Sequence, residues 1–342
     1  MLSRKSNWCL ITTYKENYLL LPAILSYYRD FYGIQHFLIF CGLTGTHTHE
    51  TLKQSLCPQL PVIAPPLDKT LMTPGHRELT VSEFSAKDFV LWVASYPTSN
   101  YSADLEWTAI RSDLEKWAHR FLPAQISRTI LIDNDEFLYV NQPGALEALD
   151  GLGFHFIDIV PCAQWPPERL VFSLQGWYYH RQAQPLFKYG GPLMIKLARR
   201  LRRGLHHGGC KTFYFDRDRL GNGTAWRHGG TEQSFSCCFA LDHFLGDTRH
   251  CHKILRDTAC CYHLGMTSRD HYFSQKLHLF ARIQTDMKRK PVPNAGRSSE
   301  TLDLRKAQRT FDRFMKESRF PVIEDNFLLP FLQTPMRVEA ER

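Results

Sequence analysis

The chain has 342 residues, of which 43% are hydrophobic and 13% aromatic, enough for a globular protein with one large domain or two smaller ones. Its formal net charge of +8 favours anionic partners such as nucleotide phosphates or anionic lipids, whereas nucleic acid is disfavoured because no basic repeat is interleaved with aromatic residues. No apolar run is long enough to span a bilayer, and Lys15 and Glu16 interrupt the first one, so we expect a cytoplasmic protein without a transmembrane or secretory segment.

The N-terminal part of the chain predicts a strand, a helix and a second strand. Residues 8–13 and 35–41 are apolar runs typical of buried strands. Between them, apolar side chains recur at three- and four-residue spacing until Gly33, so we expect one amphipathic helix that ends there. Its apolar positions are Leu20, Leu21, Ile24, Leu25, Tyr28 and Phe31.

A further helix follows. Residues 60–65 are a short strand candidate, residues 66–89 show no clear period, and residues 104–121 have the apolar spacing of a helix. Alternating strands and helices are typical of a parallel α/β sheet with right-handed crossovers. In such sheets, ligands bind beyond the carboxyl ends of the strands.

The next strand ends in acidic residues. The apolar residues 129–132 lead into the Asp-Asn-Asp-Glu stretch of residues 133–136, and residues 137–140 resume the apolar pattern. On an extended chain, Asp133 and Asp135 would project from the same side and converge on one divalent cation. Burying carboxylates without a cation is costly, so we favour such a site over acids that cap a turn or pair with surface arginines.

The second half of the chain is less regular. Further strands are predicted at residues 154–160, 170–174, 211–215 and 253–256. The Cys/His-rich residues 206–263 contain no Cys-x-x-Cys pair, which argues against zinc. Ten cysteines spread through a long chain without a signal peptide are expected to be reduced thiols rather than a disulfide framework.

A basic helix and a polar linker are predicted in the C-terminal part. The helix spans residues 193–205, and its basic residues lie between 196 and 203. This pattern is typical either of contact with an anionic membrane surface or a lipid-linked acceptor, or of a helix with a solvated face. Residues 287–299 are rich in Lys, Arg, Pro, Asn, Gly and Ser, which indicates an exposed linker before a last helix at residues 302–319.

Three groups of landmarks occur in a recognisable order. They are Thr13-Tyr14-Lys15-Glu16-Asn17 with the tyrosine-rich helix and the second strand, then Asp-Asn-Asp-Glu-Phe at residues 133–137, then Lys253-Ile254-Leu255-Arg256 with Tyr262-His263-Leu264-Gly265. Together they resemble the family 2-like glycosyltransferases of the GT-A fold. The resemblance implies an α/β GT-A domain at residues 1–280, with a mostly parallel central sheet flanked by helices. We expect a linker at residues 281–300 and a helical C-terminal extension at residues 301–342.

The resemblance also implies a nucleotide-sugar donor and a divalent metal, Mn²⁺ or Mg²⁺, that neutralises the leaving pyrophosphate. Asp135 would be the direct metal ligand, and Asp133 would contact the ribose or a metal-bound water. His263 would be the second protein ligand, with a hydrogen-bonded core histidine as the alternative. The residues assigned to donor binding are Thr13, Lys15, Glu16, Asp133, Lys253 and Arg256.

An acceptor hydroxyl must lose a proton in an inverting displacement, so a carboxylate is needed near the acceptor. The Gly-Gly-Thr-Glu stretch at residues 229–232 resembles the Gly-Gly-Glu-Asp type loop of some GT-A enzymes. Glu232 is therefore the candidate catalytic base, with an acid at a helix N-terminus as the alternative and Asp242 as a weaker substitute. The acceptor would be a glycan or lipid-linked hydroxyl, as in the synthesis of a surface polysaccharide or lipopolysaccharide.

One departure from the family leaves two alternatives open. Relatives carry an acidic turn after the second strand, whereas residues 41–47 of this chain read Cys-Gly-Leu-Thr-Gly-Thr-His. A catalytically silent nucleotide-sugar-binding relative would account for this change. A metal-dependent phosphotransferase or hydrolase could also use Asp133 and Asp135, acting on a phosphate ester without a sugar nucleotide.

Overall fold

The computed structural model describes thirteen segments of the chain, and the statements below concern these residues. They are residues 5–14, 20–43, 68–86, 89–97, 103–140, 146–147, 150–151, 153–160, 162, 165–173, 210–228, 260–264 and 322–333. Within these segments, no helix is both long and apolar enough to cross a membrane.

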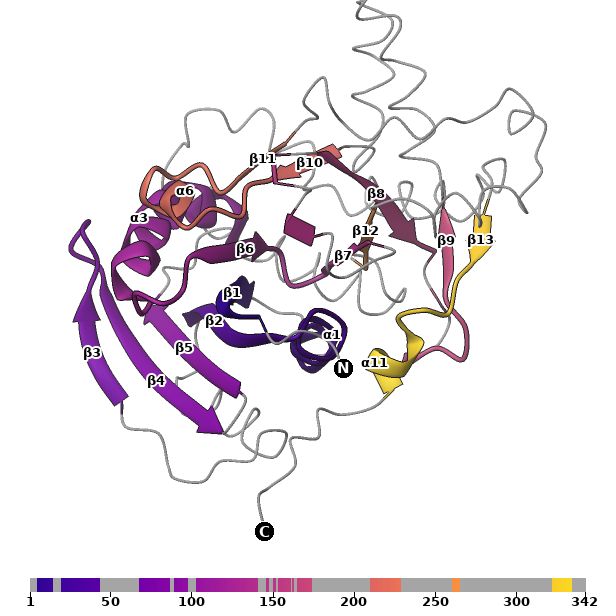
Figure 1. The fold of residues 1–342 in the computed structure, drawn as a ribbon, viewed down its shortest axis with the longest axis horizontal. Helices are drawn as coiled ribbons and strands as arrows, with labels where there is room; N and C mark the ends of the chain where they lie inside the picture. Colours follow the sequence, from indigo (N-terminus) through magenta and orange to yellow (C-terminus); the bar gives the residue numbers. More distant parts are fainter. Residues whose placement is uncertain are drawn as a thin grey trace, which may run out of the picture.

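The first of two sheets has the strand order β3-β4-β5-β2-β1-β6 (Figure 1). Strands β5, β2, β1 and β6 run parallel, so their carboxyl ends meet at one edge, called the carboxyl edge below. Strands β3 and β4 are antiparallel to their neighbours. The bounds are β1 (Lys5–Tyr14), β2 (Ile34–Leu43), β3 (Asp68–Met72), β4 (Glu78–Ala86), β5 (Phe89–Pro97) and β6 (Arg128–Ile132).

The second sheet has the order β11-β10-β8-β12-β7, and β9 pairs with both β8 and β13. Only β12 and β8 are parallel here, and the other pairs are antiparallel. The protein is therefore an α/β fold with mixed sheets, and the expected parallel order holds only for β5-β2-β1-β6. The bounds are β7 (Glu136–Tyr139), β8 (Gly153–Ile159), β9 (Val171–Ser173), β10 (Cys210–Phe213), β11 (Trp226–His228), β12 (Cys260–His263) and β13 (Val322–Glu324).

The two longer helices cover opposite faces of the first sheet (Figure 1). Alternate residues of β1 point to opposite faces: Trp8 and Leu10 join the core around α1 (Leu21–Tyr32), and Cys9 and Ile11 join the core around α3 (Ala103–Phe121). This two-sided burial explains why β1 reads as a continuous apolar run. The core around α1 also includes the inner residues of the second sheet, so α1 packs against both sheets.

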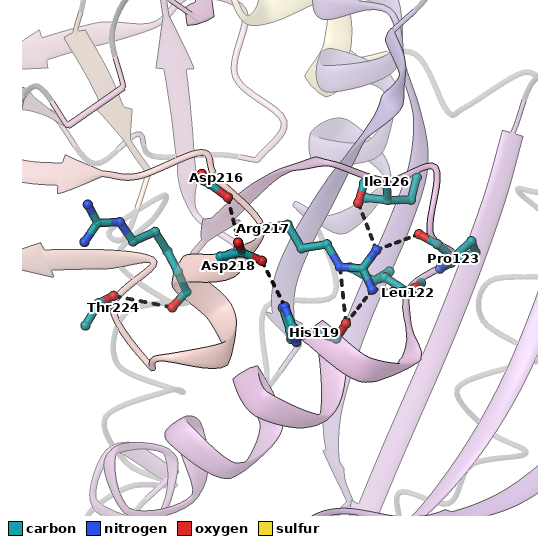
Figure 2. Close-up of polar contacts among 9 residues, drawn as sticks. His119, Leu122, Pro123, Ile126, Asp216, Arg217, Asp218 and Thr224 are labelled. Atoms are coloured by element: carbon teal, nitrogen blue, oxygen red, sulfur yellow. Dashed lines mark hydrogen bonds and ion pairs between the residues drawn. The ribbon is translucent and has the colours of Figure 1, made fainter.

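The end of α3 is held by an arginine from a distant segment (Figure 2). Arg217 precedes the short helix α6 (Asp218–Gly221), and its guanidinium donates hydrogen bonds to four carbonyl oxygens at the end of α3 and in the loop that leads to β6. These are the carbonyls of His119, Leu122, Pro123 and Ile126, at 3.2, 2.7, 2.8 and 3.0 Å. The last carbonyls of a helix lack partners within the helix, so Arg217 replaces the missing bonds and places a positive charge at the negative end of the helix dipole.

The structure confirms the predicted strands at residues 8–13 and 35–41, the helix between them and the helix at residues 104–121. Gly33 ends α1 in the left-handed conformation, with φ of 74°, as its position predicts. Residues 66–89 had no assigned period, yet they contain β3 and β4. The predictions for residues 60–65, 193–205, 253–256, 287–299 and 302–319 lie outside the described residues.

The C-terminal segment joins the fold through a strand and a short helix. Strand β13 pairs antiparallel with β9, and α11 (Leu329–Gln333) follows it. The Phe331 ring packs edge-on against Tyr27 of α1, with ring centroids 5.2 Å apart. Part of the expected extension at residues 301–342 therefore contributes to the second sheet and to the core around α1.

Two buried cysteines lie on neighbouring strands of the first sheet. Cys9 and Cys41 are buried on β1 and β2 and take no part in a disulfide. Burial raises the pKa of Cys41 to about 12, because the thiolate would lose its hydration. Such a thiol is protonated and unreactive at neutral pH.

Candidate functional site

The acidic stretch forms a turn between the two sheets. The backbone N–H of Glu136 donates to the carbonyl oxygen of Asp133 at 3.2 Å, and the Glu136 carboxylate accepts the Asp133 N–H at 3.3 Å. The expectation that Asp133 and Asp135 project from one side of an extended chain is therefore wrong. The chain must leave β6 in the first sheet and enter β7 in the second, and a turn makes that change of direction.

The turn brings Asp135 against His263. Strand β12 pairs antiparallel with β7, and His263 lies opposite Glu136. The backbone N–H of Leu264 donates to the carbonyl oxygen of Asp135 at 2.7 Å, which extends this pairing by one residue. As a result, the His263 Nε2 atom lies 3.5 Å from the Asp135 Oδ2 atom, and the two side chains are 11% and 23% exposed. Both side chains are thus largely buried, and each keeps some exposed surface.

The Asp135–His263 pair lies at the carboxyl edge of the first sheet. Ile132, the last residue of β6, is in register with Thr12 of β1, so Asp133 follows at the level where β1 is about to end at Tyr14. Parallel α/β sheets bind ligands at this edge, because successive loops leave the strands there. Thr13, assigned to donor binding, is 6% exposed and lies on β1 next to this edge.

Several residues predicted for the site lie outside the described residues. They are Lys15, Glu16, Glu232, Asp242, Lys253 and Arg256. Their roles in donor binding and in base catalysis stay predictions.

The ligand atoms of the Asp135–His263 pair suit a hard divalent cation. A carboxylate oxygen and an imidazole nitrogen are ligands that Mn²⁺ accepts, and cations that also bind substrate phosphates use as few as one or two protein carboxylates. Within the described segments, no group of three or more His, Cys, Asp or Glu side chains is arranged to hold a metal. Asp135 and His263 are therefore the described residues at this edge that could hold such a cation.

Three tyrosines of α1 hold the strand that follows the turn. Tyr27 and Tyr32 each donate a hydroxyl hydrogen bond to the carbonyl oxygen of Leu138, at 2.6 and 2.7 Å. The backbone N–H of Leu138 donates to the Tyr28 hydroxyl at 2.9 Å. Strand β7 is the last strand of its sheet, so these hydroxyls take the place of a neighbouring strand. We call Tyr27, Tyr28 and Tyr32 the tyrosine clamp.

Burial keeps the tyrosine clamp protonated. Loss of hydration raises the pKa of Tyr27, Tyr28 and Tyr32 well above the ordinary value for a phenol. An ordinary phenol is already protonated at neutral pH, and the raised pKa keeps these three hydroxyls protonated at higher pH as well. Their hydrogen bonds fix Leu138, which lies three residues beyond Asp135. The sequence pattern marked these tyrosines only as family landmarks and as apolar positions of the helix. Their clustering on one predicted helix was the feature of the sequence that could have indicated this role.

Comparison with known protein families found no matching family model, and no curated protein matched the chain.

The strand that carries His263 is anchored by the C-terminal segment. The Tyr262 hydroxyl donates to the Asp325 carboxylate at 2.6 Å, and both side chains are buried. The other oxygen of Asp325 accepts the backbone N–H of Phe327 at 3.0 Å. Asp325 thus fixes Tyr262, the residue before His263. Because Asp325 lies far along the chain from Tyr262, sequence spacing could not indicate this contact.

The tyrosine clamp makes a testable prediction. Tyr28→Phe leaves the buried N–H of Leu138 without its acceptor and is expected to lower the free energy of unfolding by about 1–3 kcal/mol. Tyr27→Phe is the matched control, because Tyr32 still donates to the Leu138 carbonyl, and we expect it to cost no more than about 1 kcal/mol. Urea denaturation measures both values, and equal losses for the two variants would contradict the assignment.

Proposed function

We propose that this chain is a metal-dependent glycosyltransferase of the GT-A type, in which Asp135 and His263 hold a divalent cation. The observation that supports the proposal is the 3.5 Å approach of these two side chains. The family resemblance assigns both residues to the metal site from separate stretches of sequence. A chance resemblance would give no reason for the two to meet, or to meet at the edge where α/β sheets bind ligands.

The residues around the pair have distinct roles in this proposal. Asp135 and His263 bind and orient the cation, which supplies positive charge for the departing pyrophosphate without proton transfer. Glu136 is 3% exposed and holds the turn through the Asp133 backbone, so it acts on position rather than on substrate. The tyrosine clamp keeps β7, and with it the turn, in place.

The acceptor and the base rest on the resemblance. We propose transfer with inversion to a hydroxyl of a glycan or a lipid-linked acceptor, with Glu232 removing the proton. The family resemblance also supports donor contacts from Thr13, Lys15, Glu16, Lys253 and Arg256. A role in the synthesis of a surface polysaccharide or lipopolysaccharide, at the cytoplasmic face of a membrane, follows from the same resemblance.

Donor binding tests the proposal. Full-length protein is screened by thermal shift with UDP-, GDP-, CMP- and dTDP-sugars, each with and without Mn²⁺. We expect at least one donor to stabilise the protein only when Mn²⁺ is present, by about 2.7 kcal/mol when its concentration is 100 times its dissociation constant. Release of the free nucleotide from the same donor is then measured.

Two outcomes would reject the proposal. The first is that no sugar nucleotide stabilises the protein in the presence of Mn²⁺. The second is Mn²⁺-dependent hydrolysis of a simple phosphate ester such as p-nitrophenyl phosphate without binding of any donor, which would indicate a phosphohydrolase. Donor binding without nucleotide release, with every acceptor offered, would instead indicate a silent relative.

A further inference from the structure

A second charged group on the carboxyl edge makes no ion pair with another described side chain. The Cζ atom of Arg77 lies 5.7 Å from the centroid of the Tyr96 ring, so the guanidinium is stacked over an aromatic face. Its Nε atom is buried and has no hydrogen-bond partner. No hydrogen bond or ion pair joins this guanidinium to another described side chain. A partly desolvated cation without an anion is unfavourable, because lost hydration is not replaced.

The turn that carries Arg77 is held in one conformation. The Asp113 carboxylate on α3 accepts the backbone N–H of Gly75 at 2.6 Å and the Thr73 hydroxyl at 2.5 Å. The Thr73 hydroxyl oxygen in turn accepts the backbone N–H of Arg77 at 2.9 Å. A Cβ atom at Gly75 would lie 2.8 Å from the Asp113 carboxyl group, so only glycine allows this approach.

The backbone before Arg77 is also strained. His76 has φ of 59°, a left-handed conformation that costs a non-glycine residue free energy. Strand β4 begins at Glu78, directly after Arg77, so the constrained turn fixes where the arginine side chain starts. A guanidinium presented from a rigid turn loses little conformational entropy when it binds a ligand.

Arg77 lies on the same edge as the Asp135–His263 pair. Strand β4 is antiparallel to β5, so the amino end of β4 meets the carboxyl end of β5. Tyr96 of β5 is paired with Gly42 of β2. The residue before Gly42, Cys41, is paired with Tyr14 of β1, so Tyr96 lies one residue beyond the end of β1. Strands β5 and β6 are separated by β2 and β1, which places them about 14 Å apart at the usual strand spacing.

We propose that Arg77, stacked on Tyr96, is a binding site for an oxyanion, either a carboxylate or a phosphate group. The planar guanidinium offers paired N–H donors that match the two oxygens of such a group, and the aromatic ring holds the plane in place. The oxyanion would belong to the acceptor, because the donor pyrophosphate lies near Asp135 in the proposed function. This assignment to the acceptor rests on the proposed function. The oxyanion site itself does not depend on that function.

The NMR signal of the Arg77 side chain reports oxyanion binding directly. Full-length protein labelled with ¹⁵N-arginine is titrated with inorganic phosphate and, separately, with acetate, at constant ionic strength balanced with NaCl. The buried Nε–H of Arg77 is expected to give a slowly exchanging resonance that is missing in Arg77→Lys. We expect this resonance to shift in a saturable way with at least one oxyanion and not with NaCl alone. The anion that saturates at the lower concentration identifies the preferred group.

A matched control separates the site from ordinary surface arginines. Arg219 also stacks on a tyrosine, with its Cζ atom 4.6 Å from the Tyr214 ring centroid, but it is exposed. Because Arg77→Lys lacks the reporting resonance, the variants are compared by the concentration dependence of thermal stabilisation with the same anions at the same ionic strength. Arg77→Lys is expected to weaken oxyanion binding about tenfold because the paired donors are lost, whereas Arg219→Lys should leave it unchanged. If Arg77→Lys unfolds, the shift of the wild-type resonance alone decides the question.

The outcomes separate this inference from the proposed function. Oxyanion binding at Arg77 that persists in Asp135→Asn supports the site whatever the donor screen shows. If no oxyanion shifts the resonance beyond the effect of NaCl, or if Arg219→Lys weakens binding as much as Arg77→Lys, the proposed site is wrong. Either result would leave the proposed binding of donor and Mn²⁺ at Asp135 and His263 unaffected.

Discussion

Asp135→Asn is expected to abolish Mn²⁺-dependent stabilisation by the donor and to lower nucleotide release on the order of 100-fold or more, because a neutral amide is a weak ligand for a hard cation. Asparagine has nearly the same shape, and the backbone bond between Leu264 and Asp135 does not involve the side chain. The fold should therefore survive the change. His263→Gln is expected to cause a similar loss, and the double variant little more, because both residues serve one cation.

A second His–carboxylate pair in the chain is the control for this prediction. His119 of α3 lies 3.2 Å from the Asp218 carboxylate, and Figure 2 shows this contact at the end of α3. Asp218 is exposed, and the end of α3 leads to the amino end of β6, opposite the carboxyl edge. Asp218→Asn removes the same kind of contact and is expected to change donor binding and turnover by less than about twofold. If Asp218→Asn and Asp135→Asn reduce Mn²⁺-dependent binding equally, the pair of Asp135 and His263 is not a metal site.

Arg217→Met is expected to lower the free energy of unfolding by about 3–4 kcal/mol. The replacement keeps much of the aliphatic stem but removes every hydrogen bond to the four carbonyl oxygens shown in Figure 2. Hydrogen bonds from a charged donor are stronger than neutral ones, and the positive charge also interacts favourably with the negative end of the α3 helix dipole. The loop that Arg217 holds leads directly into β6, so the same change should loosen the approach to the acidic turn.

The geometry of the guanidinium makes this prediction specific. Arg217→Lys keeps the charge but concentrates its donors on one nitrogen, so we expect it to recover no more than about half of the loss. Arg219→Met, two residues away on the exposed side of α6, is the control and should cost less than about 1 kcal/mol. Urea denaturation followed by circular dichroism measures all three. A loss for Arg217→Met no larger than that for Arg219→Met would contradict the role of Arg217 at the end of α3.

Local patterns predicted the elements that lie nearest the candidate site. The continuous apolar run of β1 reflects burial on both faces, and the three- and four-residue spacing of α1 reflects burial on one side, so each could be read from a short window. Strands β3 and β4 were missed. In β4, Leu79 and Val81 join the core around α3 and Phe84 joins the core around α1, so both faces are partly buried and the sequence shows no simple alternation of apolar and polar residues.

The turn at Asp133 shows a limit of the same reasoning. Two acids at alternate positions share a side only if the chain stays extended, and the sequence does not show whether a strand continues into the same sheet or into another. Here the chain changes sheets at this point, so the acids lie in a turn. Asp135 is brought against His263 by pairing with β12 rather than by strand alternation.

The order of the residues along the chain was enough to predict an α/β protein and to single out Asp133 and Asp135, because periodicity and an acidic break in an apolar run are properties of neighbouring residues. His263 was assigned through the family resemblance alone. The meeting of Asp135 with His263, the hydrogen bonds of the tyrosine clamp to Leu138 and the stacking of Arg77 on Tyr96 became visible only in three dimensions. Each of them depends on segments far apart in sequence that β pairing or helix packing brings into contact, and no local pattern encodes which distant partner a strand or side chain will find.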